Sequence, residues 1–168
     1  MKRVIKYILL LSAILFLFGC SKEEKQTVER PHPDDVIIDN INYKLDYHEE
    51  EYNIKYRVAK NFKKTVLKNS INYFSDNKNK ESNFVIRVLY YPSKDINYAI
   101  KDSVTNYDKK YEKTINNKKY IVVHFKNSEK EETNIYYYTH GKNTYAFAFT
   151  FKEDISLLEN KFLQRVEY

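Results

Sequence analysis

The stretch IYYYTHGKNTYAFAFTF, residues 135–151, decides the fold of this 168-residue chain. Its two aromatic-rich segments, 135–139 and 145–151, flank Gly141. Aromatic residues favour strands, and a glycine between two such segments is typical of a hairpin turn. Segments that are apolar on both faces need cover on both faces of their sheet. The stretch therefore predicts a hairpin within a sheet that is packed on both sides.

Further strands are predicted where apolar and polar residues alternate or where apolar residues form a dense run. These strands lie at residues 41–45, 54–58, 71–74, 84–91 and 120–125. Between the first two of them, the acidic residues 49–51 predict a charged turn.

Two other segments have the period of an amphipathic helix. Ser93 is predicted to cap the first helix, and the second is predicted over residues 153–166. Their apolar sides consist of Ile96, Ala99, Ile100, Val104 and Tyr107 in the first and Ile155, Leu158, Phe162 and Val166 in the second. Amphipathic helices of this kind lie on a sheet. We therefore expect residues 36–168 to form one α+β domain, a largely antiparallel β-sheet with two or more packed helices.

The order of these elements resembles the α/β/α sandwich of the PsbP-like family, which includes many small bacterial lipoproteins. The resemblance covers most of residues 41–168 and follows the strand at 52–58, the strand at 84–91, the helix after Pro92 and Ser93, the strand at 120–125 and the C-terminal helix ending at 162–166. It implies an accessory or scaffolding protein that binds a partner, and it implies no shared catalytic residues.

The N-terminus has the pattern of a secretory signal. Lys2, Arg3 and Lys6 precede an uncharged run of 13 residues, 7–19, which is shorter than the roughly 20 apolar residues of a membrane-spanning helix. The sequence that follows, Leu17-Phe18-Gly19-Cys20, resembles the lipobox of bacterial lipoproteins. The resemblance implies that residues 1–19 are a signal peptide and that the thiol of Cys20 carries a diacylglyceryl group. The alternative is a cleaved export signal in which Cys20 is incidental.

A lipidated Cys20 predicts a protein on the extracytoplasmic face of the cell membrane. Two acyl chains suffice for stable anchoring, and residues 20–35 hold one aliphatic side chain, so they are expected to form a flexible polar tether. The chain has 29 basic and 23 acidic side chains, and loss of the three basic residues in 1–19 leaves a net charge of about +3. This surplus does not support a nucleic-acid partner.

The sequence offers few groups for chemistry. The chain has two glycines and one cysteine, so it predicts no phosphate-binding glycine loop, no cysteine metal site and no cofactor. His48 beside the acids 49–51 allows a divalent-cation site, although a charged turn is the favoured interpretation. Whether His124 and His140 meet across neighbouring strands is left open.

Tyr136 and Tyr138 are the predicted ligand-binding residues. They share one face of a strand, on which they could stack against a sugar ring or a peptide, while half-buried packing is the alternative. Three functions are weighed for the exported domain. The first is a non-catalytic accessory domain that binds a protein or envelope ligand, and the others are a cell-envelope hydrolase and a small-ligand or metal-binding lipoprotein. The lack of a polar catalytic constellation favours the first.

Overall fold

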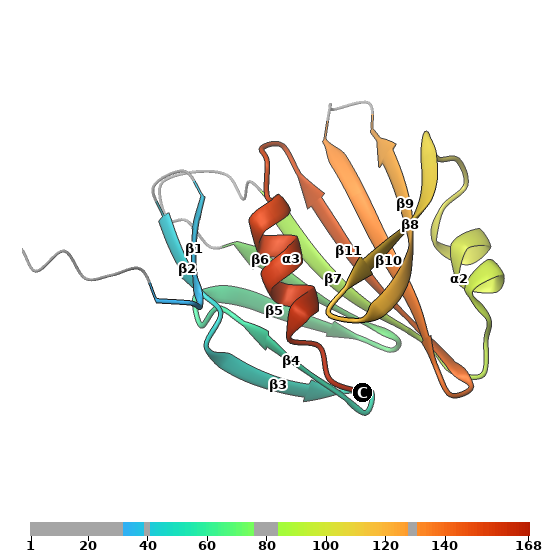
Figure 1. Cartoon of the computed structure of the whole chain (residues 1–168), viewed down its shortest axis with the longest axis horizontal. Coiled ribbons are helices and arrows are strands. Elements are labelled where there is room, and N and C mark those ends of the chain that lie inside the picture. Colours follow the sequence, from blue (N-terminus) through green and yellow to red (C-terminus); the bar gives the residue numbers. More distant parts are fainter. Residues whose placement is uncertain (1–31, 39–40, 76–83, 128–130) are drawn as a thin grey trace, which may run out of the picture. The chain divides into compact units, whose positions relative to one another are not determined.

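Strands β10 (Glu132–His140) and β11 (Asn143–Phe151) form the hairpin predicted from residues 135–151. The computed structural model describes residues 32–38, 41–75, 84–127 and 131–168, and Figure 1 shows their elements along the chain. Gly141 lies at the turn with φ of +59°, in the left-handed region that side chains with a Cβ disfavour. The hairpin prediction is confirmed.

The hairpin belongs to an antiparallel sheet that has seven strands among the described residues, in the order β5-β6-β7-β11-β10-β9-β8. Its remaining strands are β5 (Phe62–Leu67), β6 (Ser70–Ser75), β7 (Phe84–Tyr91), β8 (Lys109–Ile115) and β9 (Lys118–Lys126). After β7 the chain crosses one face of the sheet through α2 (Ile96–Ser103) to the edge strand β8. It then returns strand by strand until β11 pairs with β7.

Four shorter strands form two hairpins beside this sheet: β1 (Asp35–Ile38) with β2 (Ile41–Lys44), and β3 (Tyr47–Glu51) with β4 (Ile54–Val58). The charged turn predicted at residues 49–51 is wrong, because these acids lie on β3. Glu49 and Glu51 are two residues apart on one side of β3, and each accepts a hydrogen bond from Lys64 Nζ, at 2.6 and 3.0 Å. The turn instead comprises Tyr52 and Asn53, both with positive φ.

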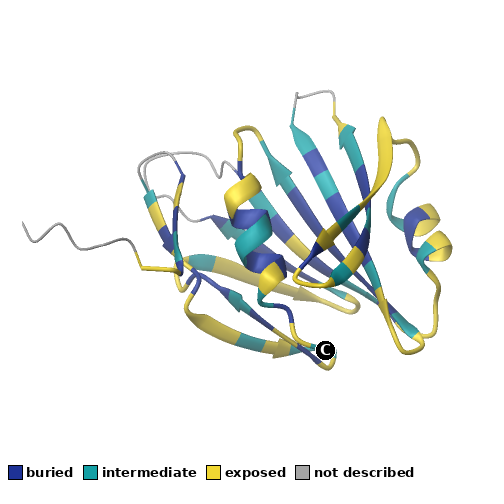
Figure 2. Cartoon of the chain, in the orientation of Figure 1, coloured by how far each residue is buried: buried dark blue, intermediate teal, exposed yellow. Residues whose placement is uncertain are grey.

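The two described helices cover opposite faces of the large sheet. On β10, Tyr136 belongs to the core beneath α3 (Ser156–Gln164), whereas Tyr137 belongs to the smaller core beneath α2. Successive strand residues point to opposite faces, so these neighbours assign α3 and α2 to different sides. Figure 2 shows the buried bands along the central strands.

The core beneath α3 is the larger one and is rich in aromatic rings. Phe162 of α3 packs on Tyr56, Phe147 and Phe149 with ring centroids 5.6–5.8 Å apart. Some of the buried tyrosine hydroxyls pair with each other, as for Tyr56 and Tyr73, whose oxygens lie 2.8 Å apart. Several of the many tyrosines of the sequence therefore pack in this core.

Both helices are shorter than the sequence patterns predict. The cap of α2 is Asp95, whose Oδ1 accepts a hydrogen bond from the backbone N–H of Tyr98 at 2.7 Å. The predicted cap, Ser93, instead has φ of 55° and donates its N–H to Asn143 Oδ1. The helix ends before Val104, so Tyr107 lies outside it and is exposed.

The coarse fold class is confirmed, because the described chain is a mostly antiparallel sheet with two packed helices. One compact unit spans His32–Tyr168, and its first described residues lie four positions before the domain start predicted at residue 36. In the part of the chain that the structure describes, no helix has both the length and the apolarity of a membrane span.

Candidate functional site

Helix α2 covers only part of its face of the sheet. Its eight residues span about 12 Å, whereas the nine residues of β11 span about 30 Å. The helix packs on Tyr137 and Ala146, and the Ser103 hydroxyl of its last turn lies 2.6 Å from the Tyr137 hydroxyl. The remainder of this face is therefore accessible beside the helix.

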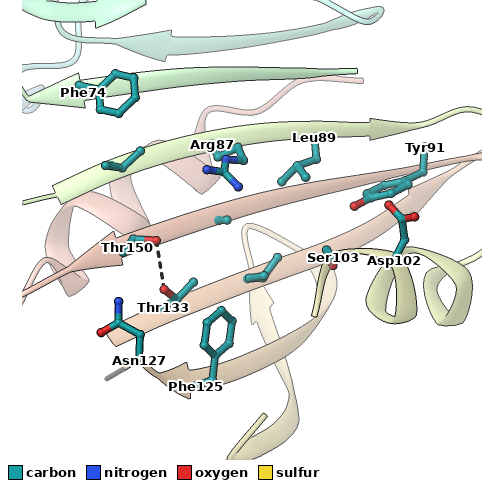
Figure 3. Close-up of a pocket in the computed structure, with 13 residues that line it drawn as sticks. Phe74, Arg87, Leu89, Tyr91, Asp102, Ser103, Phe125, Asn127, Thr133 and Thr150 are labelled. Carbon is teal, nitrogen blue, oxygen red and sulfur yellow. Dashed lines mark hydrogen bonds between the residues drawn. The ribbon is translucent and has the colours of Figure 1, made fainter. Parts of the chain in front are cut away.

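A cavity of about 500 Å³ occupies the uncovered part of the face, and Figure 3 shows the side chains that line it. Its lining residues are Phe74, Val85, Arg87, Leu89, Tyr91, Asp102, Ser103, Phe125, Asn127, Thr133, Ile135, Ala148 and Thr150. Seven of these residues are apolar or aromatic and six are polar or charged. A cavity of a few hundred cubic ångströms that combines apolar walls with polar groups is typical of a small-molecule site. We take this cavity, called the α2-face pocket below, as the candidate site.

The strand register explains why the floor is hollow. Arg87, Ala148 and Ile135 stand directly opposite one another on β7, β11 and β10. Residues paired in this way share one face of a sheet. The small side chain of Ala148 therefore leaves a depression between two long neighbours.

A second row crosses the floor one step further from α2. It runs through Val85, Thr150 and Thr133, with Phe74 and Phe125 at its two ends. The two threonine hydroxyls lie 3.0 Å apart and bond to each other, as the dashed line in Figure 3 shows. The row thus offers aromatic walls at the sides and methyl groups in the middle.

Arg87 supplies the positive charge of the pocket. Its Nε donates to Asn72 Oδ1 at 2.8 Å, and Asn72 is itself buried and paired with Arg87 across β6 and β7. Within the described ranges no carboxylate lies within ion-pair distance of this guanidinium. The side chain is thus oriented by one neutral partner while its terminal nitrogens keep their capacity to bind an anion.

The opposite charge lies at the α2 end of the pocket, where Asp102 and Tyr91 line the wall. Burial raises the pKa of the Tyr91 phenol. The hydrogen bond with Ser103 and the charge of Arg87 oppose this rise, and the charge of Asp102 adds to it. Tyr91 therefore stays protonated at neutral pH and can donate a hydrogen bond. The pocket has a cationic middle and an anionic end.

Sequence reasoning does not single out Arg87. The one signal that could have found it is its position as the only charged residue in the otherwise apolar strand at 84–91. A charge in such a run must either pair within the fold or lie on an open part of the sheet. In the structure, Arg87 lies on an open part of the sheet.

The structure places the two predicted tyrosines on the α3 side, away from this pocket. Tyr136 is 1% exposed, and its hydroxyl donates to Glu159 Oε2 at 2.7 Å. Tyr138 is half-buried and packs on Tyr120 and Tyr168, with ring centroids 5.4 and 4.7 Å apart. These contacts agree with the packing interpretation for Tyr136, and ligand binding by the pair remains a prediction.

The histidines do not come together. His124 Nδ1 lies 2.8 Å from Asn134 Oδ1 on the neighbouring strand, whereas His140 is six residues further along β10, or about 20 Å away, and stacks on Tyr168. His48 lies on β3 and is exposed. Across the described residues there is no cluster of three or more histidine, cysteine or acidic side chains with the spacing of a metal site.

Cys20, the predicted lipidation site, lies outside the described residues, as do the signal peptide 1–19 and most of the predicted tether.

Comparison with known proteins gives no family for this chain. No family model and no curated protein matches it. A crystal structure of a protein from Bacteroides thetaiotaomicron is similar at 11% identity and a TM-score of 0.49, over 68% of this chain and 44% of that protein. The chain thus spans less than half the length of that protein.

Proposed function

We propose that the mature chain is a lipid-anchored, extracytoplasmic lipoprotein whose domain binds a ligand in the α2-face pocket without catalysing a reaction. The N-terminal pattern ending in Cys20 supports the anchor. The pocket supports binding, and it is the single observation that carries this part of the proposal. The finer PsbP-like assignment is also proposed here, and helices on opposite faces of an antiparallel sheet support it.

The composition of the pocket favours binding over hydrolysis. A hydrolase needs a nucleophile or a water molecule beside a general base. The Ser103 hydroxyl in the lining is bonded to Tyr137 and lies 2.7 Å from the Ala99 carbonyl oxygen, and the hydroxyls of Thr133 and Thr150 bond to each other. No histidine is among the lining residues that the structure describes. Of the three functions considered from the sequence, the pocket favours the binding of a small ligand.

The anchor is tested by labelling cells that express the tagged full chain with an alkyne-bearing fatty acid. We expect label on the wild-type protein and none on Cys20→Ala. The matched control is Ser21→Ala, which changes the adjacent residue and should leave labelling intact. Equal labelling of the wild type and Cys20→Ala would refute the anchor.

The pocket is tested with the neutral apolar dye N-phenylnaphthylamine and the purified Cys20→Ala chain, so that no acyl group of the protein competes. We expect the dye to bind with a rise in fluorescence. Ala148→Phe, which fills the hollow, should abolish the rise. Val66→Phe adds the same ring at an exposed position of β5 outside the pocket and should not. Dye binding that Ala148→Phe leaves unchanged would refute the pocket as the ligand site.

A further inference from the structure

We propose that the α2-face pocket binds a single-chain amphiphile whose carboxylate pairs with Arg87 and whose apolar chain lies on the floor of the sheet. This inference rests on the proposed function, since it names the ligand class of the same pocket. It commits to a carboxylate with one acyl chain, the chemistry of a free fatty acid.

Asn72 orients the Arg87 side chain in the pocket. The Nε of Arg87 donates to Asn72 Oδ1 at 2.8 Å, and this bond orients the exposed guanidinium. The two terminal nitrogens form no ion pair within the described residues. A planar pair of N–H donors matches the two oxygens of a carboxylate, and charge-assisted bonds of this kind are the strong ones.

Apolar side chains surround Arg87 on this face of the sheet. Ala148 and Ile135 continue the row of Arg87 across the floor, and Leu89 and Val85 flank Arg87 on the same face of β7. An acyl chain on this surface would bury methylene groups at about 0.8 kcal/mol each. These apolar residues beside Arg87 therefore favour a ligand with a hydrocarbon body over a small polar anion.

The charges in the pocket set the orientation of the ligand. Asp102 lies at the α2 end of the pocket and repels a carboxylate there, whereas Arg87 attracts one in the middle. Phe74 and Phe125 at the ends of the second row provide aromatic walls away from Asp102. The charge pattern therefore sets the head of the ligand on Arg87, with the chain directed over the threonine methyl groups between these rings.

The experiment displaces N-phenylnaphthylamine from the purified Cys20→Ala chain with decanoate, decanol and acetate. We expect decanoate to displace the dye, decanol to do so about 10-fold less well, and acetate to have no effect. Arg87→Gln should weaken displacement by decanoate about 10-fold and leave displacement by decanol unchanged. The variant should therefore show no preference for decanoate over decanol. Arg87→Lys keeps the positive charge but lacks the paired N–H donors of the guanidinium. This variant should retain part of the preference for decanoate over decanol.

The control is Lys142→Gln, which removes one positive charge from the exposed β10–β11 turn outside the pocket and should keep the preference. Equal displacement by decanoate and decanol, or a preference that survives Arg87→Gln, overturns the carboxylate assignment while dye binding still supports the pocket. If the dye itself does not bind, the proposed function fails instead. Thermal unfolding of each variant confirms that it is folded.

Discussion

Asp34 and Arg165 form an ion pair that joins the first described turn of the chain to the end of α3. Asp34 is 7% exposed, and its carboxylate also lies 3.6 Å from Arg57. Arg165 donates in addition to the Leu45 carbonyl oxygen at 3.2 Å. Three segments far apart in sequence therefore meet at one carboxylate, at the position where the predicted tether enters the fold.

Replacing Asp34 with alanine should destabilise the domain, because two guanidinium groups then lose a mostly buried anionic partner. We expect a loss of about 2 kcal/mol in the free energy of unfolding, measured by urea denaturation. Asp46→Ala removes an exposed acid that follows β2 at the open end of the β1–β2 hairpin, and it should cost less than about 0.5 kcal/mol. Equal losses for the two variants would show that the ion pair has no structural role.

Glu159 should make stability depend on pH in the opposite sense to most acids. It is 2% exposed and accepts bonds from Asn134 Nδ2 at 2.8 Å and Tyr136 Oη at 2.7 Å. Burial raises its pKa above 4.5, and the two hydrogen bonds and Lys113 only partly oppose that rise. The folded state therefore holds this proton more tightly than the unfolded chain, so stability falls as pH rises from 4.5 through the folded pKa, and then levels.

The measurement is the difference in unfolding free energy between the wild type and Glu159→Gln across this pH range. Relative to the variant, the wild type should lose stability with rising pH. Glu50→Gln, at an exposed position, should track the wild type at every pH. A constant difference between the wild type and Glu159→Gln would mean that the pKa of Glu159 is not raised.

The central strands could be predicted because burial imposes a pattern on them, whereas the edges could not. The hairpin at 135–151 and the strand at 84–91 carry dense apolar residues. Strands β1, β5 and β8 are not predicted from the sequence. Of these, β5 and β8 are edge strands with mostly exposed side chains, such as Lys63 and Lys110, so solvent leaves no alternation to detect. The acidic residues of β3 favour a turn in the sequence pattern, because their pairing with Lys64 is a contact between distant segments that the pattern does not show.

The site was harder to predict than the fold for a related reason. Tyr136 and Arg87 are both amphipathic residues on central strands, and sequence alone does not say which face of the sheet a short helix leaves uncovered. The structure shows that α3 and the two small hairpins cover the side of Tyr136, while α2 reaches only part of the side of Arg87. The difference lies in helix position, which depends on long-range packing.

Tyr168 should contribute to stability through its ring. The ring packs on Tyr138 and Tyr145 with centroids 4.7 and 5.3 Å apart, and Lys118 Nζ lies 5.1 Å from its centre. Tyr168→Ala should therefore cost about 2–3 kcal/mol of unfolding free energy, measured by thermal and urea denaturation. Tyr107→Ala removes an exposed ring and should have almost no effect. A Tyr168→Ala protein as stable as wild type would contradict this packing role.

Asn53 offers a stabilising substitution. With Tyr52 it forms the β3–β4 turn, and φ is 54° at Tyr52 and 61° at Asn53. Two consecutive positive φ angles define the turn that favours Asn-Gly or Gly-Gly, since glycine adopts this region without steric cost. Asn53→Gly should therefore raise the unfolding free energy by about 0.5 kcal/mol, and Asn53→Ala should lower it by about 1 kcal/mol. Both substitutions remove the amide of one exposed side chain, so its loss affects the two variants equally. The difference between their unfolding free energies therefore reports on the backbone conformation. Equal unfolding free energies would show that the positive φ of residue 53 causes no strain.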